Sequence, residues 1–306
     1  MSHKKPTPKY YLEYALLRAF TAIFTLLPLG AGLVLAWLAA RFAFHVLRFR
    51  RAAAERRIVQ AVGASGRAAR RIAWISLRNF LFNTVELVRL GRMNRAWIER
   101  QVEKGDVVDR LRRDLEGQPG AVLAIPHMGN WDLAGVGIAS LGFPIFFLTG
   151  RQHNPLTDGH VNRIRRATGV EALARGDPHL LRQVLRNLKQ RKILGMMPDL
   201  RSKRRGIVVR FLGSEANVFG GMAAFAFQAR VPVLPAVATR IGWARHRWRL
   251  LEPVVPDPTA PRGAELQRLT QRVLEQHEQA IRQQPEQYFW YNTRWVLDPF
   301  PGGGKK

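Results

Sequence analysis

Residues Ala121–Gly135 read A-V-L-A-I-P-H-M-G-N-W-D-L-A-G, and this stretch decides the fold class. Ala121–Ile125 is a short apolar run that predicts one buried strand, which Pro126 ends because proline has no N–H to donate to a sheet. His127 follows the strand, and Asp132 opens a segment of helical character. Because α/β sheets place their chemistry between strand C-termini and helix N-termini, this stretch predicts a general base.

Short apolar runs alternate with helical segments along the rest of the chain. Further strands are expected at Ile145–Leu148, Ile193–Pro198, Val208–Leu212, Val233–Ala238 and Trp248–Leu251. Helices are expected near 131–140, 155–167, 178–189, 219–229 and 265–283. Asp177 is expected to cap the third of these helices, with Pro178 as its first residue. The alternation predicts an α/β fold, with a mixed central sheet flanked by helices.

The N-terminal part of the chain predicts a membrane-associated helical region. Ala19–Ala40 contains no charged residue, and as one helix it would be about 33 Å long, enough to cross the hydrocarbon core. The alternative is a helix that lies in the membrane interface, with Arg18 and Arg41 reaching lipid head groups. Basic helical segments follow as far as Arg113, so the positive-inside bias places the bulk of the chain in the cytoplasm.

The chain is strongly basic, with 49 Lys and Arg against 22 Asp and Glu among 306 residues and a net charge of +27. This excess indicates an anionic partner: nucleic acid, an anionic membrane face or a phosphorylated substrate. Cysteine is absent, which excludes disulfides, thiolate metal sites and a cysteine acyl-enzyme. The histidines lack metal-ligand spacing and the sequence has no Walker A or dinucleotide-binding motif, so no metal or cofactor is expected.

Two further charged residues and one glycine pair stand next to predicted elements. Arg165 lies in a basic run after Asn154–Pro155. Asp199 directly follows a predicted strand, and as a carboxylate among many cations it either fixes a phosphate-binding arginine or holds the histidine. Gly220–Gly221, at a predicted helix start, permits close approach of the backbone to a ligand.

Together these segments resemble the lipid A biosynthesis late acyltransferases, the lauroyl/myristoyl transferase family, and the related phosphatidylinositol mannoside acyltransferases. The resemblance covers nearly the whole chain. Five blocks carry it in order: His127-x4-Asp132, Asn154–Pro155–Leu156 with Arg165, Pro198–Asp199, Phe211–Leu212–Gly213 through Gly220–Gly221 to Pro235 and Arg240, and the closing P-E-Q-Y-F-W-Y-N-T-R-W at Pro285–Trp295. Asp132 stands where lipid A enzymes usually have Glu, which leaves a different glycolipid or an aminolipid open as acceptor.

The resemblance implies a glycerolipid-acyltransferase-like fold. It also implies transfer of a fatty acyl chain from acyl-carrier protein or acyl-CoA to a hydroxyl of an anionic glycolipid, such as a lipid A precursor. His127 would deprotonate that hydroxyl, and Asp132 would orient the imidazole and stabilise the imidazolium. Glu215 is a rival carboxylate for pairing with His127. The implied substrate-binding residues are Asn130, Arg165, Asp199 and Arg240.

Three regions are expected: a membrane anchor or interfacial helix at 1–50, a basic membrane-proximal helical region at 51–116 and the α/β acyltransferase domain at 117–300. The implied location is the bacterial inner membrane, with the catalytic domain facing the cytoplasm. Two other classes stay open. One is an acyltransferase for another glycolipid, an aminolipid or a lysophospholipid, and the other is a non-catalytic basic membrane protein that binds lipid or nucleic acid. The sequence has no nucleic-acid-binding motif, so nucleic acid is not expected as a partner.

Overall fold

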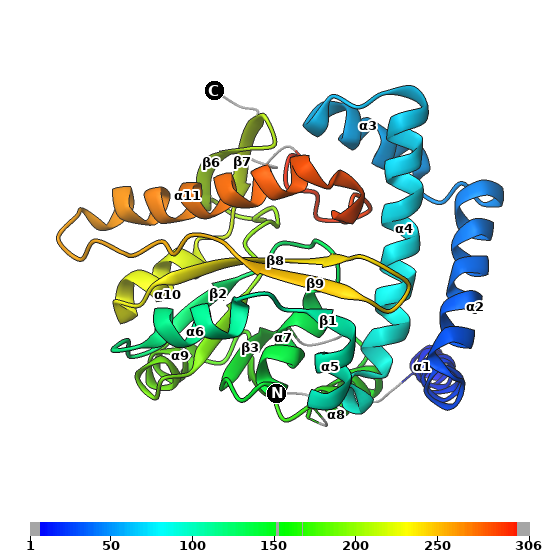
Figure 1. The fold of residues 1–306 in the computed structure, drawn as a ribbon, viewed down its shortest axis with the longest axis horizontal. Helices are drawn as coiled ribbons and strands as arrows, with labels where there is room; N and C mark the ends of the chain where they lie inside the picture. Colours follow the sequence, from blue (N-terminus) through cyan, green and yellow to red (C-terminus); the bar gives the residue numbers. More distant parts are fainter. Residues whose placement is uncertain (1–6, 151–152, 167, 299–306) are drawn as a thin grey trace.

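A seven-stranded sheet forms the centre of the molecule in the computed structural model, which describes residues 7–150, 153–166 and 168–298 (Figure 1). In order across the sheet, its strands are β1 (Val102–Glu103), β9 (His246–Leu250), β8 (Val233–Arg240), β2 (Ala121–Ala124), β5 (Ile193–Met196), β3 (Ile145–Thr149) and β4 (Glu171–Ala174). β8, β2, β5, β3 and β4 run parallel, whereas β9 is antiparallel to β8 and β1 is parallel to β9. The predicted α/β fold with a mixed central sheet is therefore confirmed.

Helices cover both faces of the sheet, as a parallel sheet with two apolar faces requires. One layer is α5 (Arg95–Gln101), α6 (Val107–Leu115) and α7 (Trp131–Ser140), and the other is α9 (Leu180–Lys189), α10 (Gly221–Ala229) and α11 (Arg262–Gln283) (Figure 1). Side chains of β2 alternate between the two cores: Leu123 packs with the first layer, and Val122 and Ala124 pack with the second. Since both faces of β2 are buried in apolar cores, a polar side chain can reach a ligand only from beyond the end of the strand.

The apolar N-terminal run does not form the single helix expected over Ala19–Ala40. The structure has α1 (Pro8–Leu26), α2 (Leu29–Arg41) and a π-helical turn η1 (Phe42–Val46). The break falls at Pro28, because proline has no N–H for a helical hydrogen bond and its ψ of 144° is extended. Among the described residues, Leu29–Val46 is the one segment long and apolar enough to cross a membrane.

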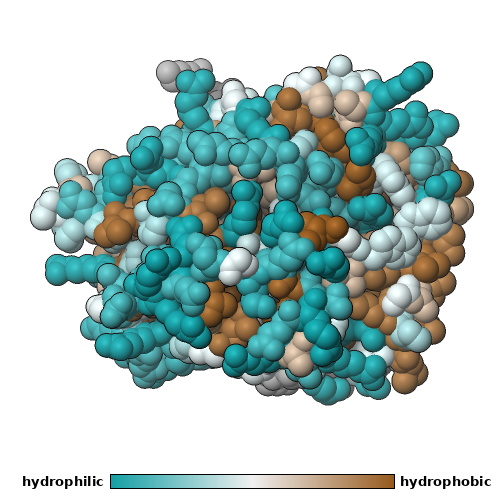
Figure 2. Space-filling model, viewed as in Figure 1, coloured by the Kyte–Doolittle hydropathy of each residue, from teal (hydrophilic) through white to brown (hydrophobic). Residues whose placement is uncertain are grey.

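Helix α2 packs on α4 (Gly66–Val88) along one side, where Leu33 and Ala36 are buried against Phe82 and Val85. The other side of α2 and much of α1 expose large apolar side chains. Figure 2 shows brown surface at the edge of the molecule where these helices lie. We call this surface the N-terminal apolar face; its main members are Leu12, Leu16, Leu26, Val34, Leu35 and Leu38.

The remaining elements are α3 (Arg51–Val62), α8 (Pro155–Arg166), the hairpin β6 (Ile207–Phe211) and β7 (Ser214–Val218), and the short turns η2 (Leu90–Arg92) and η3 (Pro285–Gln287). The strand expected near 208–212 thus belongs to a hairpin outside the central sheet. The helix expected from Pro178 begins at Leu180, so the predicted cap at Asp177 is wrong. Asp177 instead closes a turn, because its Oδ1 accepts the backbone N–H of His179 at 2.7 Å.

Candidate active site

His127 and Asp199 meet at the C-terminal edge of the sheet. β2 and β5 are parallel neighbours whose last residues, Ala124 and Met196, are paired in register. Each strand is followed by a proline and, three residues beyond its end, by His127 or Asp199. The register therefore brings the two side chains together. Asp199 Oδ1 lies 2.8 Å from His127 Nδ1, and Asp199 Oδ2 accepts the backbone N–H of His127 at 2.8 Å.

In this pair Asp199 is buried, whereas His127 is accessible from outside the protein. The side chain of Asp199 is fully buried, whereas 12% of the His127 side chain is exposed. Burial alone would lower the pKa of His127, but the charge and hydrogen bond of Asp199 and the charge of Asp132 raise it above its usual value. Burial would raise the pKa of Asp199, but the charge of His127 and the two hydrogen bonds from it lower that pKa. Asp199 is thus an anion that favours a proton on Nδ1 of His127 and leaves Nε2 as the basic nitrogen.

Tyr288 and His277 are buried next to Asp199. Burial, the charge of Asp199 and a hydrogen bond to Asp199 raise the pKa of Tyr288 well above its usual value. The phenol therefore stays protonated, and its O–H donates a hydrogen bond to the carboxylate. Burial lowers the pKa of His277 to about 4, so this imidazole is neutral and donates from Nε2 to the carbonyl oxygen of Ala124 at 3.1 Å. Of these neighbours, His127 is therefore the one that Asp199 can stabilise as a cation.

The segment Gln287–Phe289 holds the loop that carries the histidine. The carbonyl oxygen of Gln287 accepts the N–H of Gly129 at 2.8 Å, and the N–H of Phe289 donates to the carbonyl oxygen of His127 at 2.9 Å. Gly129 has a φ of +60°, and a Cβ there would collide with the carbonyl oxygen of Ala238, so this position demands glycine. The closing segment and the H-M-G-N loop, far apart in sequence, therefore form one unit.

Helix α4 places a buried carboxylate behind this loop. Both carboxylate oxygens of Glu86 accept from Arg240, at 2.9 and 2.5 Å. Glu86 also accepts from Nδ2 of Asn130 at 2.6 Å and lies 3.2 Å from Nε2 of His246. Burial opposes ionisation, but the charges of Arg240 and His246 and their hydrogen bonds lower the pKa of Glu86 to about 2. A charged Glu86 thus ties α4 to β8, to β9 and to the start of α7.

Asn130 and Arg240, both expected to bind substrate, are buried in this arrangement. Asn130 is buried, and its side-chain oxygen caps α7 by accepting the backbone N–H of Leu133 at 3.0 Å. Arg240 is 5% exposed and donates to Glu86 and to Asn83. Both side chains are buried and engaged, and they link the start of α7 and the end of β8 to α4.

The sequence offered Asp132, Asp199 and Glu215 as partners for the histidine, and Asp199 is the one bonded to its Nδ1. Asp132 lies in the first turn of α7, where its charge helps to raise the pKa of His127 after the larger effects of burial and Asp199. Asp199, and not Asp132, accepts the hydrogen bond from Nδ1 of His127, because the register of β2 and β5 sets that contact. Glu215 lies on β7 of the outer hairpin. Arg165 belongs to α8, but its side chain lies outside the described residues.

The sequence analysis did not identify the polar face of α4. Ser76, Asn79, Asn83 and Glu86 are all buried and recur every three or four residues, which places them on one side of the helix. One of them, Ser76, donates to the carbonyl oxygen of Tyr288 at 2.6 Å. The spacing itself is the signal that was available, because polar side chains at core positions normally have specific partners.

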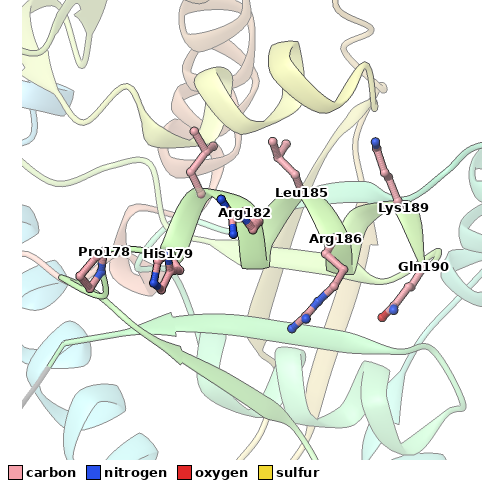
Figure 3. A pocket seen from close by; sticks show the side chains of 8 residues that line it. Pro178, His179, Arg182, Leu185, Arg186, Lys189 and Gln190 are labelled. Atoms are coloured by element: carbon pink, nitrogen blue, oxygen red, sulfur yellow. The ribbon is translucent and has the colours of Figure 1, made fainter.

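Away from the pair, a shallow groove of about 660 Å³ runs along the outer side of α9 (Figure 3). Its basic members are Arg182, Arg186 and Lys189, and Leu181 and Leu185 lie among them. Leu181 is 54% exposed, so an apolar side chain lies at the surface of the groove. In the described part of the chain, His, Asp and Glu side chains form no group of three that could hold a metal ion.

Comparisons with known proteins extend over most of the chain. The family model described as bacterial lipid A biosynthesis acyltransferase matches residues 2–296. The phosphatidylinositol mannoside acyltransferase of Mycolicibacterium smegmatis is 24% identical over 217 residues, which make up 70% of this chain and 68% of that protein. The phosphatidylinositol mannoside acyltransferase of Mycobacterium tuberculosis is 24% identical over 218 residues, 70% of this chain and 66% of that protein.

Proposed function

The chain belongs to the bacterial lipid A biosynthesis acyltransferase family, and we propose that it moves a fatty acyl chain from acyl-carrier protein or acyl-CoA to a hydroxyl of an anionic glycolipid. The observation that carries this proposal is the buried Asp199, bonded to Nδ1 of a partly exposed His127. That arrangement is what a general base for a hydroxyl group needs. The relatives named as phosphatidylinositol mannoside acyltransferases support a phosphate-containing glycolipid as the acceptor class.

The proposed reaction needs one proton relay and no covalent enzyme intermediate. With Nδ1–H held by Asp199, Nε2 of His127 removes the proton from the acceptor hydroxyl. The acceptor oxygen attacks the thioester carbonyl, forms the ester bond and expels the donor thiolate, which takes the proton from the imidazolium. Asp199 stabilises that imidazolium while it exists, because its carboxylate is buried and keeps its charge.

The pH dependence of the rate reports on the charge around His127. The imidazole is a base only when neutral, so kcat/KM should rise with pH through a pKa that lies above the usual histidine value. Asp132→Asn removes one negative charge that raises this pKa, so the rising limb should move to lower pH. Steady-state rates of acyl transfer between pH 5 and 9 measure the shift. A limb that stays in place would show that Asp132 does not act on the imidazole by charge.

The acceptor can be identified in cells. Lipids from a deletion strain, complemented with the wild-type gene or with His127→Ala, are compared by mass spectrometry. We expect one glycolipid to lose a single acyl chain in the deletion strain and to regain it with the wild-type gene alone. A lipid A precursor, a phosphatidylinositol mannoside, an aminolipid and a lysophospholipid differ in head-group mass, so the same experiment separates these acceptors. Identical lipids in all strains would oppose the proposal.

The proposal places the protein at the cytoplasmic face of the bacterial inner membrane. Residues 1–50 form its membrane-associated region, 51–116 the membrane-proximal helices and 117–300 the acyltransferase domain. Because α2 packs on α4 along one side, it can offer only its other side to lipid. This supports a helix that lies in the interface, with the N-terminal apolar face among the acyl chains, over a helix that spans the bilayer. The predicted acceptor contact of Arg165 stays part of the proposal.

The basic groove on α9 suits an acidic carrier protein as donor. Arg182→Glu/Arg186→Glu should raise the KM for acyl-carrier protein by roughly 3- to 10-fold, because exposed interface charges contribute about 0.2–1 kcal/mol each. The KM for acyl-CoA should not change. Arg249→Glu/Arg262→Glu, an equal change at two exposed positions, is the matched control. An equal rise for both donors, or no rise for either, would remove α9 from donor binding.

A further inference from the structure

The turn that joins β8 to β9 exposes two large apolar side chains. Arg240 pairs with His246 at the end of this hairpin, so the turn consists of residues 241–245. Ile241 is 36% exposed and Trp243 is 49% exposed. All residues of β8 are buried, so apolar side chains reach the surface only where the hairpin turns.

The turn has a fixed position in the fold. The backbone N–H of Ile241 donates to the carbonyl oxygen of Arg245 at 2.9 Å, and Nη1 of Arg240 donates to the carbonyl oxygen of Trp243. The centroid of the Trp243 ring lies 5.3 Å from that of the Phe82 ring on α4. Trp243 is therefore held in place while about half of its surface stays exposed.

The turn adjoins the N-terminal helices. Ala244 packs against the cluster that Leu33 and Ala36 of α2 form with Phe82 and Val85 of α4. Figure 1 shows the turn between β8 and β9 reaching α4 on the side of the molecule where α2 lies. The outer side of α2 belongs to the N-terminal apolar face. The exposed side chains of the turn therefore lie next to that face, although they are far from it in sequence.

The chemistry of this region matches an anionic lipid bilayer. From Tyr14 to Val85 the sequence has eleven arginines and one acidic residue, Glu55. This charge attracts anionic head groups, whereas a second copy of the same face would be repelled. Tryptophan concentrates at the boundary between lipid and water, because its ring is apolar and its N–H seeks a polar partner. A half-exposed tryptophan beside an apolar face thus favours lipid as the occupant.

We propose that the β8–β9 turn is a second membrane contact, with Ile241 and Trp243 in the interfacial layer of an anionic bilayer. The assignment rests on the membrane position proposed for the N-terminal apolar face, and it does not depend on acyl transfer. Unlike α1 and α2, the turn belongs to the central sheet. Two contacts from different parts of the fold would fix the tilt of the α/β domain on the membrane.

Hydrogen bonds connect the turn to the loop that carries His127. The backbone N–H and carbonyl oxygen of Arg240, at the start of the turn, bond to the side-chain amide of Gln287 at 2.8 and 3.1 Å. The carbonyl oxygen of Gln287 in turn accepts the N–H of Gly129 at 2.8 Å. A bilayer that holds the turn therefore also sets the direction from which a membrane lipid approaches His127.

A site-specific label tests the contact directly. Because the chain has no cysteine, Ile241→Cys and Val255→Cys each provide one thiol, which is labelled with nitrobenzoxadiazole. Val255 is 64% exposed and follows Val254, which pairs with Val233 at the other end of β8, so it is the matched control. The labelled full chains are mixed with phosphatidylglycerol vesicles whose lipids carry bromine near the head group. We expect several-fold more quenching at position 241 than at position 255.

Equal quenching at the two positions would overturn the proposal even if the N-terminal helices bind the vesicles. A full chain that does not bind the vesicles at all would overturn both this contact and the proposed membrane position. Neither readout involves acyl transfer, so the result is independent of the proposed reaction.

Vesicle binding by tryptophan variants measures the strength of the contact. Trp243→Gln should lower the partition coefficient of the full chain into phosphatidylglycerol vesicles by roughly 5- to 50-fold, because a large apolar surface no longer enters lipid. Trp243→Phe should recover part of this loss, and Val255→Gln should change nothing. Thermal unfolding without lipid checks that each variant is folded. Unchanged partitioning of Trp243→Gln, or a wild-type dimer that Trp243→Gln abolishes, would overturn the proposal.

Discussion

Asp199→Asn should lower kcat for acyl transfer by roughly 1,000- to 10,000-fold, with KM nearly unchanged. A neutral amide neither selects the tautomer with the proton on Nδ1 of His127 nor stabilises the imidazolium that forms during the reaction. The change is isosteric and Asp199 lies in a buried site, so circular dichroism and thermal unfolding should establish that the protein is folded before rates are compared. Steady-state transfer from a labelled thioester gives the rate.

Asp132→Asn is the matched control for this prediction. It removes a carboxylate charge near His127, in the first turn of α7, but keeps the hydrogen bond between Asp199 and Nδ1 of His127. Because Asp132 acts on the imidazole by charge, we expect its loss to cost less than the loss of Asp199. A larger fall in kcat for Asp132→Asn than for Asp199→Asn would assign the orienting role to Asp132.

Glu86→Ala should lower the free energy of unfolding by about 3–5 kcal/mol, because it leaves the guanidinium of Arg240 buried without its carboxylate. It also removes the acceptor for Asn130 Nδ2, and an unsatisfied buried amide costs about 1–3 kcal/mol. Chemical denaturation of the full chain measures the change. Since Asn130 caps α7 next to the loop that carries His127, activity should fall together with stability.

Two variants make the stability prediction specific. Glu99→Ala breaks an exposed pair with Arg95 and should change the free energy of unfolding by less than about 1 kcal/mol. Glu86→Gln/Arg240→Met removes the buried Glu86–Arg240 pair as a whole and should cost less than Glu86→Ala, because no guanidinium is left buried without its carboxylate. If Glu86→Ala were no less stable than Glu99→Ala, the buried cluster would not be what holds α4 to the sheet.

Both members of the proposed catalytic pair follow the same pattern in the sequence. His127 and Asp199 each follow an apolar run and a proline, and both were predicted at strand ends. Asp199 was expected either to hold the histidine or to fix an arginine, and the sequence could not decide between the two, because the contact depends on β2 and β5 being neighbours in register, which no local pattern reveals. Closeness in sequence favoured Asp132 instead. The fold class was recoverable because strand and helix periods are local, whereas the order of strands in a sheet is not.

The burial of Asn130 and Arg240, two of the expected substrate-binding residues, could not be read from the sequence for a related reason. An exposed asparagine or arginine near a sheet edge is a natural ligand contact, and residue type alone does not reveal burial. Asn130 and Arg240 meet Glu86 from positions 44 and 154 residues away. In contrast, the break between α1 and α2 follows a local rule, because it falls at Pro28.

The central claim is that His127 is the general base, and acyl transfer by His127→Ala tests it most directly. The thioester of acyl-carrier protein, labelled in the acyl chain, is mixed with the acceptor lipid identified by mass spectrometry, and labelled product is measured in a single turnover. We expect the rate to fall by roughly 100- to 10,000-fold relative to wild type, with the protein folded and no label bound to it. Transfer by His127→Ala at the wild-type rate would contradict general-base catalysis by this histidine.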